Sequence, residues 1–345
     1  MTVCFNCGIG KAAIAIGYCV DCLRNLPDES HLSSIHSKSR EQFGLREHPP
    51  KEQDGITCQR CTNSCQLEND STGFCGIRYN KDDQLINKVP SDSALAHMYL
   101  DPLPTNCCAG WFCRGQGKSG YNLAVFFYGC NFDCLFCQNS SHKLLKEASV
   151  ITEDELVTAA LDAKVKCICF FGGSPEPQLP FAIRVAQRII DKSDNQKHIC
   201  WEWNGCGNEK MVIEAAETSH KSGGTVKFDL KFRHPNIAYA FCGVNNQKSF
   251  DNFSTLANLY SNSELLTATT LLVPYYTDRH EVRNISKFIA WHNQNIPYSL
   301  LVFHPDYFLR DLPFTSREHV EECYREAKNY LNRVNIGNKH LLKLC

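Results

Sequence analysis

Three cysteines in the segment FFYGCNFDCLFCQNS, residues 126–140, have the type and spacing for metal chemistry. Cys130, Cys134 and Cys137 form a C-x3-C-x2-C pattern directly after an apolar and aromatic stretch that predicts a buried strand. A closed zinc site needs four ligands, and a [4Fe-4S] cluster held by thiolates also normally takes four. Three thiolates therefore leave one metal corner open to a further ligand.

An iron with an open corner is the kind of site that binds the amino and carboxylate groups of S-adenosylmethionine. One electron from the cluster then cleaves the sulfonium to a 5′-deoxyadenosyl radical, chemistry that the cofactor carries while the protein supplies position. We expect Phe136, next to the last cysteine, to face the adenine. The alternative is a zinc knuckle whose fourth ligand comes from elsewhere in the chain.

A second motif, CFFGGSPEPQ, places Gly172 and Gly173 at the end of another predicted strand. Glycines allow the backbone to approach a ligand closely, although a tight turn is the simpler interpretation of this segment in isolation. The carboxyl ends of parallel strands meet on one rim of a barrel. We therefore expect the glycine pair to lie beside the three cysteines.

The whole chain has the composition of an ordinary globular protein of 345 residues, with 43% apolar residues and a formal net charge of -1. That charge excludes a general field that would recruit nucleic acid or anionic lipid. We expect a cytoplasmic protein with no membrane partner, because no long apolar run is seen. Twenty-one cysteines at short spacings then favour metal ligands over disulfides.

Two upstream cysteine sets each supply four ligands. Cys4, Cys7, Cys19 and Cys22 form C-x2-C-x11-C-x2-C, which is typical of a zinc ribbon that stabilises a small fold. The next set is C-x2-C-x3-C-x9-C, where zinc and an auxiliary [4Fe-4S] cluster both fit, with zinc slightly favoured. Its members are Cys58, Cys61, Cys65 and Cys75.

The other cysteines have weaker patterns. Two interpretations fit Cys107, Cys108 and Cys113. They either ligate a metal or face a substrate, or they belong to a buried structural loop. Cys206 follows a predicted strand on the active rim and stays ambiguous. We expect the remaining internal cysteines to be small core or helix residues: Cys167, Cys169, Cys200, Cys242 and Cys323.

From residue 121 onward, short apolar runs alternate with amphipathic stretches, which predicts β-α units and a parallel sheet. The expected fold class is α/β, a partial (β/α)6 TIM-type barrel preceded by small cysteine-rich modules; a doubly wound sheet is the alternative. We expect six strands, at residues 122–129, 167–173, 198–205, 225–232, 265–274 and 298–305. We expect helices at residues 152–164, 181–192, 209–222, 250–261, 278–295 and 316–333, the first with a capping box of Thr152 and Glu155.

The expected domain organisation follows these patterns. It comprises a zinc-ribbon-like module at 1–26, a linker at 27–54, a cysteine-rich metal-binding segment at 55–120, the partial barrel at 121–310, and a C-terminal helix and tail at 311–345. Residues 84–103 show no clear period.

The chain resembles the radical S-adenosylmethionine (radical SAM) superfamily, and within it the pyruvate formate-lyase activating enzyme group. The resemblance covers roughly residues 55–310 and rests on the cysteine pattern, the glycine pair, EWNG at 202–205, FDLK at 228–231 and LLVPYYTDRHEV at 271–282. Two positions depart from the group: Ser174 replaces an acidic residue, and Tyr275 stands where glycine is usual.

The resemblance implies roles for further residues. Lys231 and His304 would lie near the methionyl carboxylate, Asp229 near the substrate or cofactor, and Asn204 of EWNG would contact the cofactor. Period-2 geometry places Asp229 and Lys231 on one face of their strand, so an internal ion pair is the alternative to a catalytic or cofactor role.

The function implied is a radical SAM oxidoreductase that uses a [4Fe-4S] cluster and S-adenosylmethionine to abstract hydrogen from a macromolecule. A protein, including a glycyl target, is favoured, and flavodoxin or ferredoxin is the expected electron donor. One alternative is modification of RNA or a cofactor, with the N-terminal ribbon as a docking module. The other is an iron-sulfur or zinc scaffold without catalysis.

Overall fold

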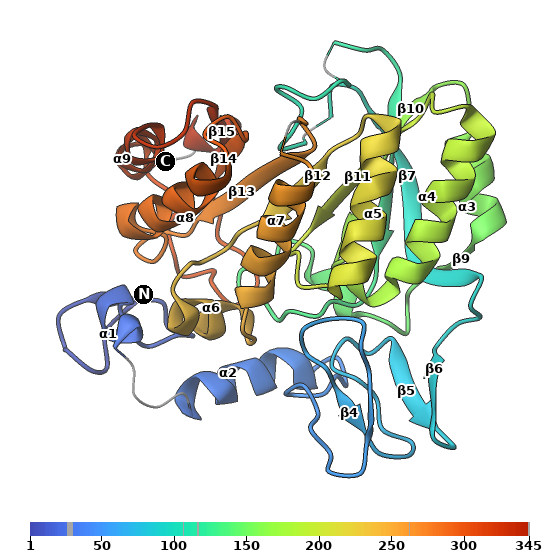
Figure 1. Ribbon diagram of the computed structural model, residues 1–345. Coiled ribbons are helices and arrows are strands. Elements are labelled where there is room, and N and C mark those ends of the chain that lie inside the picture. The colour runs from blue at the N-terminus through green and yellow to red at the C-terminus, as the bar shows by residue number, and fades with distance from the viewer. Residues whose placement is uncertain (26–29, 106, 116, 262, 344–345) are drawn as a thin grey trace.

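A single curved sheet forms the centre of the computed structural model, which describes residues 1–25, 30–105, 107–115, 117–261 and 263–343 (Figure 1). Six parallel strands lie next to one another in chain order, each pairing with the next. They are β8 (Tyr121–Phe127), β10 (Val165–Gly172), β11 (His198–Trp203), β12 (Val226–Asp229), β13 (Leu266–Leu272) and β14 (Tyr298–Val302). The predicted partial (β/α)6 barrel is confirmed.

Helices connect these strands and pack in sequence order along the outside of the sheet, where each contacts the next (Figure 1). They are α3 (Glu153–Ala160), α4 (Leu179–Ser193), α5 (Glu209–Ser222), α7 (Gln247–Leu259), α8 (Arg279–His292) and α9 (Arg317–Lys328). The predicted capping box is present, because the Thr152 hydroxyl accepts from the Glu155 N–H and the Glu155 carboxylate accepts from the Thr152 N–H. The apolar periodicity located all six helices, with their ends shifted by a few residues.

The sheet extends beyond the predicted barrel at both edges. Strand β7 (Ser93–Pro102) runs antiparallel to β8, and β9 (Val150–Thr152) pairs antiparallel with β7. Strand β15 (Val334–Gly337) adds to β14 in parallel, so the tail after α9 joins the sheet. Strand β7 was not predicted, because its first four residues, 93–96, are all buried and do not alternate between buried and exposed positions.

The first module packs against the barrel through Tyr276. The Ala13 N–H donates to the Tyr276 hydroxyl at 2.8 Å, and that hydroxyl donates to the Tyr18 carbonyl at 2.9 Å. The Tyr276 side chain is fully buried. The elements of the module are β1 (Thr2–Val3), β2 (Lys11–Ala12) and α1 (Val20–Arg24).

The second cysteine-rich module binds the loop after β11. The Thr62 N–H donates to the Cys206 carbonyl at 3.0 Å, and the Asn208 N–H donates to the Arg60 carbonyl at 2.9 Å. Cys206 is fully buried, and its carbonyl also accepts from the amide of Asn131, within the C-x3-C-x2-C segment, at 3.3 Å. The module contains β3 (Ile56–Thr57), β4 (Gln66–Leu67), β5 (Arg78–Lys81) and β6 (Gln84–Asn87).

Helix α2 (Ser30–Glu41) occupies much of the segment 27–54 that was predicted to be a linker. The linker prediction is wrong for these residues. The face of α2 that packs on the barrel carries polar side chains, including His36, Ser39 and Arg40, which are nearly fully buried. A polar buried face leaves no apolar periodicity in the sequence, so the segment resembled a solvated connection.

The partner of α2 is Asp133, a fully buried carboxylate inside the C-x3-C-x2-C loop. It accepts hydrogen bonds from His36 Nδ1 at 2.8 Å and Ser39 Oγ at 2.9 Å, and forms an ion pair with Lys143. Arg40 Nη1 lies 3.6 Å from the same carboxylate. Burial raises the pKa of Asp133, but the His36 hydrogen bond and the charges of Lys143 and Arg40 outweigh it, and the pKa falls well below its usual range.

Among the described helices, none is long and apolar enough to cross a membrane.

We predict that Asp133→Asn will destabilise the fold by about 3–5 kcal/mol, because Lys143 and Arg40 would keep buried charges without their counter-ion. Urea unfolding under anaerobic conditions measures the change. Asp154→Asn is the matched control, since Asp154 pairs with Arg188 at the exposed end of α3 and should matter little. Equal midpoints for the two variants would contradict the role given to Asp133.

Candidate functional site

The three-cysteine loop begins where β8 ends, at the carboxyl rim of the barrel. Its backbone is held by the last turn of α6 (Pro235–Cys242), whose free carbonyls accept from the loop. The Asp133 N–H donates to the Cys242 carbonyl at 2.8 Å, and the Leu135 N–H donates to the Phe241 carbonyl at 2.9 Å. Helix α6 was not predicted, and it also contacts α2, because His36 Nε2 lies 3.2 Å from the Ala240 carbonyl.

The three thiols line one cavity, although among the described residues their sulfur atoms do not form a group within 4.8 Å of one another. Burial, followed by the neighbouring Cys134, raises the pKa of Cys130 well above its ordinary value, and burial raises the pKa of Cys137 to about 12. Cys134 differs, because a hydrogen bond from Cys242 and the charge of Lys231 lower its pKa. Thiols that burial keeps protonated give up their protons when they bind a metal ion.

A cavity of about 210 Å³ opens beside these thiols. It is bounded by residues from the ends of β8, β10, β11, β12, β13 and β14, as expected for a site on the carboxyl rim. Most of the residues predicted from the sequence line it together: Cys130, Cys134, Cys137, Phe136, Gly172, Gly173, Asn204, Asp229 and Lys231.

His304 is the predicted cofactor residue that lies apart from the others. Within the described residues it is not among those that line the cavity. Its Nδ1 lies 3.1 Å from the Pro305 carbonyl, and its Nε2 lies 4.0 Å from Asp306. A role for His304 in cofactor binding stays a prediction.

The glycine pair is required by packing against β8. A Cβ atom on Gly173 would lie 2.3 Å from the carbonyl oxygen of Gly129, at the start of the cysteine loop. Gly172 has a φ of 117°, and a Cβ there would lie 2.5 Å from the Phe127 nitrogen. Both glycines also line the cavity, so their expected close approach to a ligand stays a prediction.

Tyr275, where the resembled group has glycine, also has a left-handed backbone, with a φ of 70°. Glycine adopts this conformation at no steric cost, which explains the usual residue. Lys11 of the first module lies over the Tyr275 ring at 5.2 Å from its centroid.

Asp229 and Lys231 lie on one face of β12 and its extension, as their spacing predicts. They form an ion pair with each other, so the internal pair considered from the sequence is present. Lys231 Nζ also lies 5.2 Å from the centre of the Phe136 ring. The other carboxylate oxygen, Asp229 Oδ1, is buried without a hydrogen-bond partner among the described residues.

Glu176, which was not predicted, is a fully buried carboxyl group just behind the glycine pair. Its Oε1 accepts from the Gly205 N–H at 2.7 Å, and its other oxygen accepts from the Ser174 hydroxyl. Ser174 in turn accepts from the Asn204 amide at 2.9 Å. An acidic group therefore lies close to the position where Ser174 replaced one, and burial raises its pKa to about 7.

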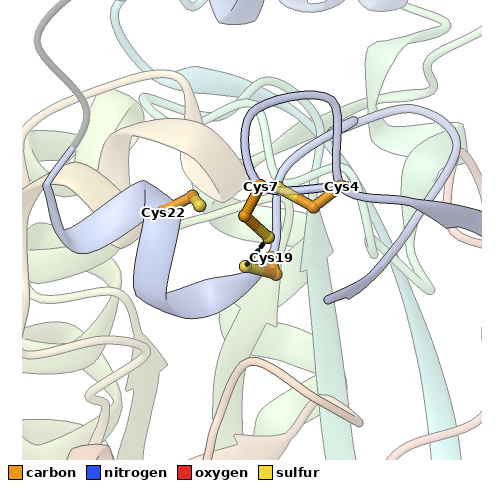
Figure 2. Close-up of side chains that lie close together, drawn as sticks. All are labelled: Cys4, Cys7, Cys19 and Cys22. Atoms are coloured by element: carbon orange, nitrogen blue, oxygen red, sulfur yellow. Dashed lines mark hydrogen bonds between the residues drawn. The ribbon is translucent and has the colours of Figure 1, made fainter. Parts of the chain in front are cut away.

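The first upstream set of cysteines converges on one point (Figure 2). The Sγ atoms of Cys4, Cys7, Cys19 and Cys22 all lie within 4.8 Å of one another, and those of Cys7 and Cys19 are 3.9 Å apart. Four thiolates at this spacing fit a closed metal site.

The second upstream set of cysteines forms a less compact group. Burial, together with the charges of the other thiols in the set, raises the pKa of Cys61 well above normal and that of Cys75 to about 12. Among the described residues, Cys58, Cys61, Cys65 and Cys75 do not form a group within 4.8 Å. The choice between zinc and an auxiliary cluster stays open.

The residues at the rim fit a three-thiolate cluster with a small polar ligand. Three thiols reach one cavity, which leaves a corner of a four-iron cluster for a ligand from the cavity side. Two residues that line the cavity have a buried side-chain atom without a hydrogen-bond partner among the described residues, and a bound ligand would supply one: Asp229 through Oδ1 and His142 through Nδ1.

One family model and two relatives match this chain. Residues 124–289 match the family model of the Radical SAM superfamily. A putative glycyl-radical enzyme activating enzyme of Methanocaldococcus jannaschii is 24% identical over 221 residues, which are 62% of this chain and 88% of that protein. An uncharacterized protein of the same organism is 23% identical over 290 residues, 82% of this chain and 81% of its own.

Two solved structures are similar to parts of the chain at low similarity. A domain of pyruvate-formate lyase-activating enzyme from Bacteroides vulgatus has a TM-score of 0.42 at 18% identity, covering 49% of this chain and 98% of its own. Streptococcus suis SuiB bound to S-adenosylmethionine has a TM-score of 0.45 at 12% identity, covering 61% of this chain and 47% of its own.

Glu176 should make stability depend on pH. Its folded pKa of about 7 lies above the ordinary value of 4.5, so folding favours the protonated form. The stabilisation is complete below about pH 4.5 and is lost as the pH rises to about 7, on the order of 3 kcal/mol. Glu176→Gln, which keeps the acceptor for the Gly205 N–H, should remove this slope in urea unfolding at pH 5 and pH 8. Parallel pH profiles for the two proteins would show that Glu176 is not buried as a neutral acid.

Proposed function

This chain carries a radical SAM domain at residues 124–289, and we propose that it abstracts hydrogen from a protein substrate, in the manner of a glycyl-radical enzyme activating enzyme. A [4Fe-4S] cluster, when bound, supplies one electron that cleaves S-adenosylmethionine to methionine and a 5′-deoxyadenosyl radical, which takes a hydrogen atom from the substrate. The observation that carries this proposal is the convergence of three thiols, the glycine pair and the partly buried Asp229–Lys231 ion pair on one cavity.

The chain's own residues would perform three tasks at this rim. Cys130, Cys134 and Cys137 would hold the cluster by three irons. Lys231 would provide the positive charge for the carboxylate of S-adenosylmethionine, in addition to its pair with Asp229. Asp229 Oδ1, which has no partner among the described residues, would accept a hydrogen bond from an amino or hydroxyl group of the cofactor.

The fixed surroundings of the loop would protect the cluster. The cations Lys143 and Arg40 lie on the far side of Asp133, and their charge offsets the anionic thiolates nearby. The aromatic rings of Phe132 and Phe136 are almost fully buried beside the thiols and exclude water from this wall of the cavity. Exclusion of water limits side reactions of a radical.

The partners are also proposals. The relative named as an activating enzyme supports a protein substrate, including a glycyl target, and a flavodoxin or ferredoxin would supply the electron. The two upstream modules, each with four cysteines, would act in folding or docking outside the radical site, with zinc or an auxiliary cluster as their metal.

We predict that Cys134→Ala will reduce the formation of 5′-deoxyadenosine from S-adenosylmethionine to background under anaerobic, reducing conditions. The reason is that the two remaining thiolates are too few to hold the cluster. Cys323→Ala is the control, since Cys323 is fully buried on α9 and does not line the cavity in the described residues. Cleavage retained in the Cys134→Ala protein would overturn the assignment. Loss of cleavage in both variants would indicate a general effect of removing a buried thiol.

Lys231→Met keeps the apolar stem and removes the charge. It should weaken binding of S-adenosylmethionine by an amount on the order of 2–5 kcal/mol, because a carboxylate in the cavity would lose its cation. Calorimetry on protein with full iron content measures the effect, with Lys287→Met on the outer helix α8 as the control. Unchanged affinity would leave Lys231 with only the internal pair to Asp229.

A further inference from the structure

A second cavity, of about 270 Å³, lies in the same barrel on the side of the amino ends of the strands. The segment between β7 and β8 contributes to its wall, together with residues of β10, β11 and β12. Phe171 and Glu202 line both this cavity and the rim cavity. The two cavities are therefore adjacent spaces in one barrel interior.

Cysteines from three parts of the chain face this second cavity. The segment between β7 and β8 contributes Cys107 and Cys113, and the barrel strands contribute others that were predicted to be plain core residues. The strand cysteines that line the cavity are Cys167, Cys169 and Cys200. A four-ligand set was not found near Cys107 in the sequence, because its neighbours in space come from distant strands.

One group within this wall has the geometry of a metal site. The Sγ atoms of Cys107 and Cys108 and a carboxylate oxygen of Glu202 all lie within 4.8 Å of one another. Two thiolates and one carboxylate are a donor set suited to a thiophilic divalent ion such as zinc. Cys107 and Glu202 both line the cavity, so a fourth coordination position would face its interior.

Lys227 lies against this group and donates hydrogen bonds to it. Its side chain is 1% exposed, and its Nζ lies 2.9 Å from a Glu202 oxygen and 3.2 Å from Cys107 Sγ. The same ammonium lies 3.1 Å from Cys169 Sγ. Hydrogen bonds from a neighbouring donor orient and stabilise the ligands of metal sites.

The charges of this group balance when a divalent ion is present. Two thiolates and the Glu202 carboxylate carry three negative charges, and the ion and Lys227 carry three positive charges. Without the ion, two neutral thiols and the Glu202–Lys227 pair are also neutral, so metal binding would exchange two thiol protons for one cation. Neither state leaves a net charge on the group, so the buried Lys227 ammonium keeps a counter-charge in both.

We propose that Cys107, Cys108 and Glu202 bind one thiophilic divalent metal ion inside the barrel, with Lys227 donating hydrogen bonds to the ligands. Three protein ligands and an open position are the arrangement of zinc sites that bind an exchangeable molecule. A substrate group with a nitrogen, oxygen or sulfur donor would then bind next to the rim cavity. The site stands on its own geometry and does not depend on the radical reaction.

Metal content of the full-length protein, purified anaerobically, tests the site. Cys108→Ser and Glu202→Gln should each contain about one zinc ion per chain less than the unmodified protein, while iron content stays the same. Cys113→Ser is the matched control, because Cys113 belongs to the same segment and lines the same cavity but is outside the ligand group. It should retain the ion.

Titration with Co²⁺ of protein stripped of zinc provides a second readout. The difference spectrum between the unmodified protein and Cys108→Ser should show thiolate-to-cobalt charge transfer, and Lys227→Met should weaken this binding about 10- to 100-fold. Circular dichroism confirms folding of each variant. Equal zinc content and identical cobalt spectra in the unmodified, Cys108→Ser and Glu202→Gln proteins would overturn the proposal, as would equal loss in Cys113→Ser.

Discussion

The buried charge of Asp133 is the interaction on which the rest of the site depends. A carboxylate with no exposure to solvent costs several kcal/mol unless cations and hydrogen-bond donors surround it. Its donors come from α2, and Lys143 lies just beyond the last cysteine of the loop. The loop can therefore keep its thiols in place only when the N-terminal segment has folded onto the barrel, which couples the upstream region to the radical site.

Paired charges also occur inside the barrel, along β12 and its extension. Lys227, Asp229 and Lys231 alternate along one strand, so all three face inward, and each charge has a partner. Lys227 pairs with Glu202 in the second cavity, and Lys231 pairs with Asp229 in the rim cavity. Glu202 lines both cavities, so the charged residues of the two cavities lie on the neighbouring strands β11 and β12.

Sequence patterns predicted the parts whose signal is local. The β-α alternation located the six parallel strands, and the end of β8 carries the three cysteines as expected. Long-range polar contacts left no such signal: α2 buries polar side chains against Asp133, and Glu176 reaches the Gly205 N–H across a loop. Lys227 was missed for the same reason, because its cysteine partners lie far away in the chain.

Electron paramagnetic resonance of the reduced, iron-loaded protein tests the central claim most directly. A cluster held by three thiolates has one iron that S-adenosylmethionine can bind, so adding the cofactor should change the signal of the reduced cluster. The Cys130→Ala protein should lack that signal, whereas Cys323→Ala should retain both the signal and its response. A cluster signal that is unchanged by S-adenosylmethionine would contradict an open iron at the rim and with it the proposed radical chemistry.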